Sequence, residues 1–318
     1  MLSRRLCNFA DAVWGSLFYR EVPVKKLIKT TLALFLILAL TSCATEQEPP
    51  ELTTQTKSGG KLIDARRNDA RLVDARRFVK RDDFEGAQPV KLPNSVKALV
   101  VPHHTVASRL AARLIGGLAE HPPETVVLLG PNHANTGPGI ATTYAAFTTY
   151  HTTIRPDETR IRVLENKRFA GVSDALFEHE HSVGALVPLI AKYLPQTKIV
   201  PIVFHRGVPL RDAMEAIGTV YSIEDASTVI IASIDFSHGL PSKEEPARRA
   251  KILEYVEAYD WRAVLPLDET YLDAPVVLAA LLRMMEGEIT VFDSANAADL
   301  LGHDVPDATG YLTVAFHQ

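Results

Sequence analysis

Four short apolar runs, separated by stretches of helical periodicity, constrain the fold of this chain more than any other feature of its sequence. The runs cover residues 98–101, 125–129, 198–204 and 228–234 and are rich in β-branched side chains. Continuous apolar runs of about four to eight residues are typical of strands that are buried on both faces of a sheet. The sequence therefore predicts a central sheet with a covering layer on each side.

Helical patterns lie between these runs. Apolar residues repeat every four positions over 106–114, and a second amphipathic set covers 183–194, with Ser182 as its predicted N-cap. Further helices are predicted over 211–221, 245–259 and 275–286, and a last strand over 311–316. This alternation predicts an α/β fold with a largely parallel central sheet and helices on both faces.

Histidines follow the ends of three of the predicted strands. The first strand ends at the pair His103 and His104, the second is followed by His133, and the fourth by Asp235 and His238. In open α/β sheets, ligands bind at the carboxyl ends of the strands. We therefore expect these side chains to share one site, which the fold must assemble because their spacing matches no local metal motif.

A further polar cluster, EHEHS at 178–182, precedes the helix predicted at 183 and could join this site. Alternate residues of an extended segment point to opposite sides. This favours His103 over His104 and His181 over His179 as the residues that face the site.

Composition limits the partners and the ligand types. The formal net charge is -4 and aromatic residues make up 7% of the chain, so there is neither a basic surface nor an aromatic stacking platform for nucleic acid. The two cysteines, Cys7 and Cys43, both precede the apolar runs. A metal site in the main domain must therefore use His, Asp or Glu.

The N-terminal region has the features of an export signal. Three lysines precede an apolar run at 30–39 that is too short to span a bilayer comfortably. The run ends in LTSC, which resembles the bacterial lipobox, so Cys43 is the predicted site of acylation; the alternative is a signal anchor that stays uncleaved. The predicted organisation is an N-terminal extension with a lipoprotein-type signal peptide (1–43), a flexible linker (44–60), a charged lead-in (61–96) and the main domain (97–318). We expect a lipoprotein anchored in the cell envelope, on the periplasmic side of its membrane.

Seven sequence blocks, taken in order, resemble the Memo family, the B component of the AmmeMemoRadiSam system. They are VPHHTVAS, LLGPNH, EHEHSVGALVP, KIVPIVF, IASIDFSH, YLDAP and TGYLTVAF, and the resemblance covers about residues 97–318. The family's fold is similar to that of LigB-type (class III) extradiol dioxygenases, which use non-haem iron. The resemblance thus implies a metal-binding α/β domain.

The resemblance also implies roles for individual residues. His103 and His133 match two metal-ligand histidines of the family. Asp235 and His238 match the DFxH pair beside the metal, and Glu180 and His181 match the EHS block. The roles expected from this match and from general chemistry are proton transfer for His238, orientation of a neighbouring imidazole for Asp235, and contact with substrate or metal for His181.

The third ligand is where the chain departs from the family pattern. Many members carry a cysteine near the start of the last long helix, whereas this chain has Asp273 there. We expect Asp273 to be the third ligand; the alternative is an N-cap of the following helix. Two imidazoles and one carboxylate with open positions suit Fe(II), with copper or zinc as alternatives.

The expected function is a metal-dependent oxygenase or hydrolase of unknown substrate. The alternative is a non-catalytic module that sequesters metal, or holds a peptide or a partner, in the same pocket. Fold alone does not decide between these functions. The family's system name implies AMMECR-type and radical SAM partners, which are cytoplasmic and which an exported lipoprotein would not meet.

Overall fold

The computed structural model describes residues 71–222 and 227–318. The predictions for the signal peptide, Cys43 and the linker therefore lie outside the described residues. Within the described ranges, no helix is both long enough and apolar enough to cross a membrane.

Four parallel strands form the centre of the main sheet, as the apolar runs predicted. They lie in the order β2 (Val96–Val101), β9 (Thr228–Ser233), β3 (Thr125–Pro131) and β8 (Lys198–Phe204). Because all four run in one direction, the loops that follow their carboxyl ends meet along one edge of the sheet.

Antiparallel strands extend this sheet on both sides. On the β2 side lie β12 (Ala308–His317), β10 (Phe236–Leu240) and β11 (Glu288–Asn296). Beyond β8 lies β4 (Ile140–Thr142), antiparallel to β8, and then β7 (Gly171–Val172), which is parallel to β4. The sheet is thus parallel at its centre and antiparallel at both flanks.

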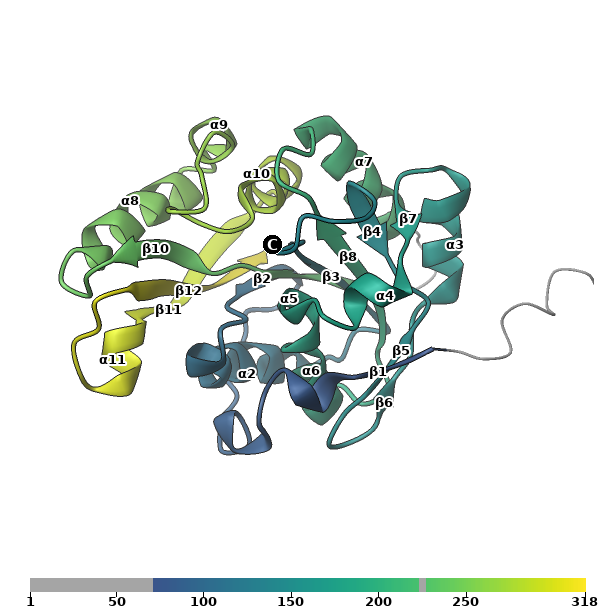
Figure 1. The fold of residues 1–318 in the computed structure, drawn as a ribbon, viewed down its shortest axis with the longest axis horizontal. Helices are drawn as coiled ribbons and strands as arrows, with labels where there is room; N and C mark the ends of the chain where they lie inside the picture. Colours follow the sequence, from purple (N-terminus) through teal and green to yellow (C-terminus); the bar gives the residue numbers. More distant parts are fainter. Residues whose placement is uncertain (1–70, 223–226) are drawn as a thin grey trace, which may run out of the picture. The chain divides into compact units, whose positions relative to one another are not determined.

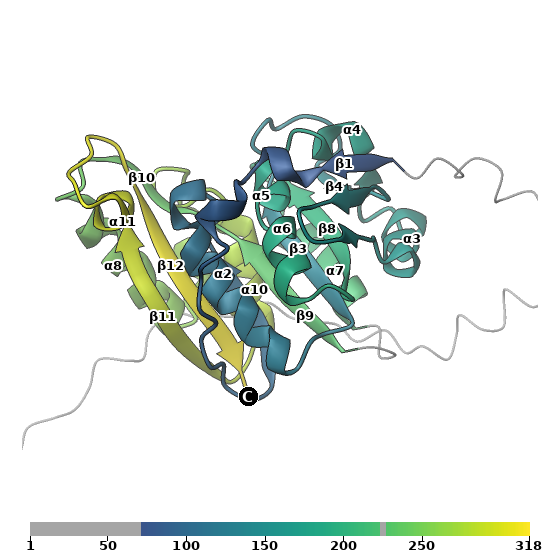
Figure 2. The same ribbon diagram turned by 90° about the horizontal axis from the view of Figure 1, so that it is seen from below.

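Helices cover both faces of the main sheet, as Figures 1 and 2 show. The helices on one face include α3 (Glu158–Asn166), α7 (Leu210–Tyr221), α8 (Glu245–Glu257) and α10 (Pro275–Met284), and those on the other include α2 (Ser108–Gly117) and α6 (Val187–Tyr193). Along β2, Ala98 and Val100 pack with the first set of helices, whereas Leu99 and Val101 pack with the second. This alternation is what a strand buried on both faces requires.

The part of the lead-in that the structure describes packs against the domain. Its strand β1 (Leu72–Asp74) pairs with β5 (Ala146–Thr148), which pairs in turn with β6 (Thr153–Ile154) to form a small second sheet. Val73, Val79 and Phe84 are buried in the same apolar cluster as α2 and α6. Residues 71–96 therefore contribute to the core.

The helix predicted over 183–194 is wrong in its detail, because the structure has two helices there: α5 (His181–Gly184) and α6. Glu180, and not Ser182, caps α5: the Glu180 carboxylate accepts a hydrogen bond from the Ser182 backbone N–H. The Ser182 hydroxyl instead donates to the carbonyl oxygen of Pro131, 2.9 Å away, and so ties α5 to the end of β3. A Cβ on Gly130 would lie 2.5 Å from the Ser182 Oγ, so this close approach needs glycine.

A buried ion pair within α8 lies against the antiparallel flank of the sheet. The Arg249 Nε lies 3.0 Å from the Glu245 Oε1, and Glu245 is fully buried. The Arg249 guanidinium also donates to the hydroxyl of Ser294 on β11. A Cβ on Gly310 would overlap the Glu245 carboxylate, so the glycine on β12 makes room for the charge.

Candidate metal centre

The structure brings most of the predicted site residues together at the carboxyl ends of the central strands. His103 follows β2, His133 follows β3, and Asp235 follows β9. Asp273 precedes α10, and Glu180 caps α5. Five separate segments of the chain thus supply the cluster, which explains why no local sequence motif marks it.

His103 is buried, and its ring is held in one tautomer. Its Nδ1 lies 2.9 Å from the Ser233 Oγ, and that hydroxyl donates its single hydrogen to the Ser182 carbonyl oxygen, 2.6 Å away. Ser233 must therefore accept from Nδ1–H, which leaves a lone pair on the His103 Nε2. Burial, with the nearby His133 and His181, lowers the pKa of His103 well below its usual value, so the ring is neutral.

His133 is fixed in the same way by Glu180. The His133 Nδ1 lies 2.7 Å from the Glu180 Oε1, and the His133 backbone N–H donates to the Oε2 at 2.8 Å. Burial alone would raise the pKa of Glu180, but hydrogen bonds from His133 and Ser182, together with the closeness of the His133 ring, lower it to about 2. An ionised carboxylate only accepts, so the Nδ1 carries a hydrogen, and in the neutral ring the His133 Nε2 is then the nitrogen whose lone pair can bind a cation.

Two carboxylates approach the free nitrogens. The His103 Nε2 lies 3.3 Å from the Asp273 Oδ2 and 3.4 Å from the Asp235 Oδ2, and the His133 Nε2 lies 3.9 Å from the Asp273 Oδ2. Burial and the negative charge of Asp235 raise the pKa of Asp273 well above its usual value. Lone pairs of nitrogen and oxygen that face one another at these distances need a proton or a cation between them.

Backbone pairing places Asp273 in the cluster. Leu272 forms an antiparallel bridge with Phe236, and the backbone N–H groups of Ser237 and His238 donate to the Tyr271 and Thr270 carbonyl oxygens. The segment 270–273 is thereby held against β10, and the Asp273 carboxylate accepts from the Asp235 backbone N–H at 3.3 Å. Asp273 is not the N-cap of α10. The N-cap is Ala274, and no side chain caps this helix.

His181 offers a second way to complete the cluster. Its ring stacks on that of His133, with 3.9 Å between centroids, and lies 5.2 Å from the ring of His103. Ligand atoms of His103, His133 and His181 lie within 4.8 Å of one another, and so do those of His103, Asp235 and Asp273. His103 belongs to both groups and is therefore the centre of the cluster.

His238 lies beside the cluster and outside both groups. Burial lowers the pKa of His238, against the opposing charge of Asp235. Among the described residues, the buried side-chain polar atoms without a hydrogen-bond partner are the His238 Nε2, the Ser237 Oγ and the Asn132 Oδ1. Asn132 belongs to the LLGPNH block, and Ser237 and His238 belong to the IASIDFSH block. A bound ligand or water there would satisfy these three atoms. Ser237 also has a left-handed backbone (φ 46°), a strained conformation typical of functional sites.

His104 points away from the cluster, as the alternation of side chains predicted. Its Nδ1 lies 2.6 Å from the hydroxyl oxygen of Tyr311 on β12, while its backbone N–H and that of His103 donate to the Asp235 Oδ1. Sequence reasoning missed the Tyr311 contact and the role of Ser233. The only signal for Ser233 was a hydroxyl in an otherwise apolar strand, which needs a partner when it is buried.

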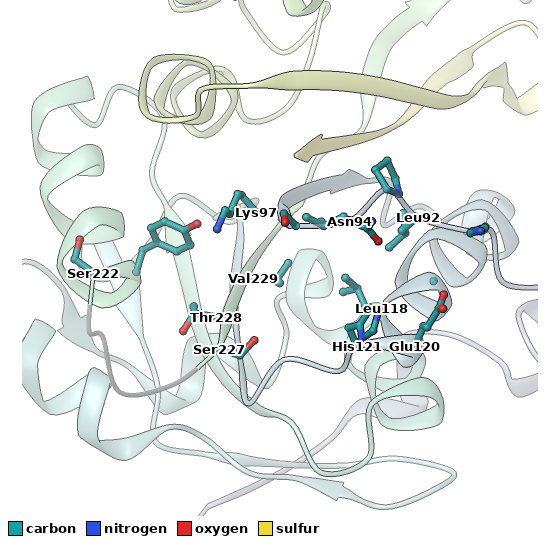
Figure 3. Close-up of a pocket in the computed structure, with 16 residues that line it drawn as sticks. Leu92, Asn94, Lys97, Leu118, Glu120, His121, Ser222, Ser227, Thr228 and Val229 are labelled. Carbon is teal, nitrogen blue, oxygen red and sulfur yellow. The ribbon is translucent and has the colours of Figure 1, made fainter. Parts of the chain in front are cut away.

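A cavity of about 880 Å³ lies at the other end of the central strands, away from the histidine cluster. Figure 3 shows Lys97, Leu118 and Val229 around it. It adjoins the amino ends of β2 and β9 and includes none of the clustered histidines or carboxylates. In sheets of this kind, ligands bind at the carboxyl ends, so the histidine cluster is the better candidate site.

The fold and the cluster define an α/β protein with a candidate metal site at the carboxyl ends of its parallel strands. The profile of the Memo family, described as Memo-like protein, matches residues 82–299. The chain therefore belongs to the Memo family.

Curated relatives agree with this assignment. MEMO1 family proteins from Methanopyrus kandleri and Aquifex aeolicus are 29% and 28% identical to the chain, over 71% and 73% of it and 85% and 89% of their own lengths. Among solved structures, an uncharacterized protein from Escherichia coli K12 has a TM-score of 0.46 and 15% identity, over 69% of this chain and 99% of its own. That structural likeness is too distant to carry an argument about the site.

Proposed function

We propose that the chain binds a divalent transition metal through His103, His133 and Asp273 and acts as a metal-dependent oxygenase or hydrolase. Fe(II) is the ion that we assign to the site, ahead of copper or zinc, because two imidazoles and a carboxylate with open positions suit non-haem iron. The observation that carries the proposal is the fixed orientation of both rings, since each histidine bonds through its Nδ1 to a buried partner and turns its Nε2 toward Asp273.

The surrounding residues would each have a separate task. Glu180 orients His133, and Ser233 orients His103. Asp235 would fix the loop after β2, through the backbone N–H groups that it accepts, and add negative charge beside the ion. The buried, unpartnered Nε2 of His238 could accept a proton from a bound substrate and return it. A bound divalent ion would supply Lewis acidity or redox chemistry.

Metal content tests this proposal and identifies the third ligand. The full-length chain would be purified without oxygen, as wild type and as the variants Asp273→Asn and His181→Ala, and analysed by mass spectrometry for iron, copper and zinc. We expect near-stoichiometric iron in the wild type and in His181→Ala, and at most about a tenth of that iron content in Asp273→Asn. If metal is retained in Asp273→Asn but lost in His181→Ala, the third ligand is His181 and not Asp273. If the wild type binds no metal, the proposal is refuted.

We also propose that Cys43 carries the lipid that anchors the chain in the cell envelope. The support is the order of lysines, apolar run and LTSC in the sequence. Cells fed a labelled fatty acid should label the wild-type protein, and Cys43→Ser should lose the label and leave the membrane fraction. Labelling that persists in Cys43→Ser would contradict the anchor. A chain without the lipid anchor could then meet the cytoplasmic AMMECR-type and radical SAM partners.

A further inference from the structure

A cavity of about 470 Å³ adjoins the candidate metal centre, and Asp273 forms part of its lining. Two segments build its walls: the loop between β8 and α7, and the segment that leads from α9 (Trp261–Val264) to α10. The volume lies in the range of sites that hold small organic ligands. A molecule in this cavity would therefore reach the cluster from the side of Asp273.

The walls of this cavity are mostly apolar. The apolar part of the lining comes from Phe204, Val208, Leu265, Leu267, Pro275 and Val276. These side chains would remove the surface of an apolar ligand from water, at about 25 cal/mol per Å². The cavity thus fits a compact apolar body better than a sugar or a peptide backbone, which would leave hydrogen-bonding groups unpaired.

The charges of the lining disfavour an anionic body. Among the described residues that line the cavity, Arg206 is the only arginine or lysine, and its guanidinium forms an ion pair with Glu269 across the two segments. Asp268 adds a further carboxylate, which accepts hydrogen bonds from the Thr270 backbone N–H and hydroxyl. An anion in the cavity would therefore meet carboxylates and no unpaired arginine or lysine.

We propose that this cavity binds the apolar body of an uncharged small organic substrate and directs one polar atom of it toward Asp273. This inference names the substrate class of the proposed metal site and rests on that function for its chemistry. The cavity itself can be tested without metal, because its walls do not depend on an ion.

Two probes with the same aromatic ring test the proposal: benzyl alcohol, which is uncharged, and phenylacetate, which is an anion. Each would be titrated into the full-length chain, with and without metal, and followed by ligand-observed NMR. We expect saturable binding of benzyl alcohol with a Kd of about 1 mM, as befits so small a ligand. Without metal, phenylacetate should bind at least about fivefold more weakly.

Three variants locate the binding. Val208→Trp should fill the cavity and lower the affinity for benzyl alcohol at least about tenfold. Val172→Trp, at an exposed position of β7, should leave that affinity unchanged. Glu269→Gln should remove the ion-pair partner of Arg206 and so raise the affinity for phenylacetate about two- to fivefold. Equal binding by wild type and Val208→Trp would overturn the proposal, even in a protein that holds metal. Val208-dependent binding by a wild-type chain that takes up no added metal would instead support the cavity and refute only the metal site.

Discussion

His103→Ala should reduce the bound metal to background, whereas His104→Ala should keep it at the wild-type level. The two histidines are neighbours in sequence, but only the His103 Nε2 faces Asp235 and Asp273. The His104 ring instead bonds to Tyr311 on β12. Since His103 belongs to both possible ligand groups, its loss cannot be compensated by a switch from one group to the other.

Metal content and thermal unfolding, measured together, check this prediction. An ion at about 100 times its Kd stabilises a folded protein by about 2.7 kcal/mol, so added metal should raise the Tm of wild type and His104→Ala. The Tm of His103→Ala should not respond. Circular dichroism of both variants controls for misfolding. Equal metal in the two variants would show that the ion is bound elsewhere.

Arg249→Met should lower the free energy of unfolding by about 3–5 kcal/mol, because it leaves the buried Glu245 carboxylate without its partner. The matched control is Lys251→Met. Lys251 lies on the same helix and pairs with Glu254, but both side chains are more than half exposed. An exposed pair contributes little to stability, so this variant should unfold much as the wild type does.

Urea unfolding of the single and double variants measures the effect. Replacing both partners, as Glu245→Met with Arg249→Met, should recover much of the loss, because no unpaired charge then remains in the core. A double variant as unstable as Arg249→Met would show that the loss of stability comes from packing around α8 and not from the unpaired Glu245 carboxylate. If Arg249→Met and Lys251→Met lose similar amounts of unfolding free energy, the Glu245–Arg249 pair is not buried as described.

The central sheet could be predicted because its strands are buried on both faces. Such strands must be apolar throughout, and the four runs stand out for that reason. By contrast, β11 mixes polar and apolar residues along a half-buried edge, so it gives no comparable signal. The single helix predicted over 183–194 reflects another limit: α5 and α6 present apolar residues to the same core cluster, so the pattern continues across the break between them.

The site was predictable in outline for the same reason that the sheet was. Parallel strands bring their carboxyl ends together, so residues after β2, β3 and β9 were expected to meet. The partners that fix the tautomers could not be assigned, because Glu180 and Ser233 act through contacts between distant segments. Likewise, the family resemblance suggested Asp273, but only the pairing of residues 270–273 with β10 brings its carboxylate to the histidines.

The two histidines and the proposed third ligand, Asp273, are held in place by different kinds of contact. The two imidazoles depend on the strands of the sheet and on buried hydrogen bonds, which tolerate little change. Asp273 depends on a short segment held by backbone contacts, which are indifferent to the side chain that the segment carries. A single codon change there can exchange a hard oxygen donor for a soft sulfur donor while the scaffold stays the same. In this architecture, the donor type at position 273 can therefore change without a change of fold.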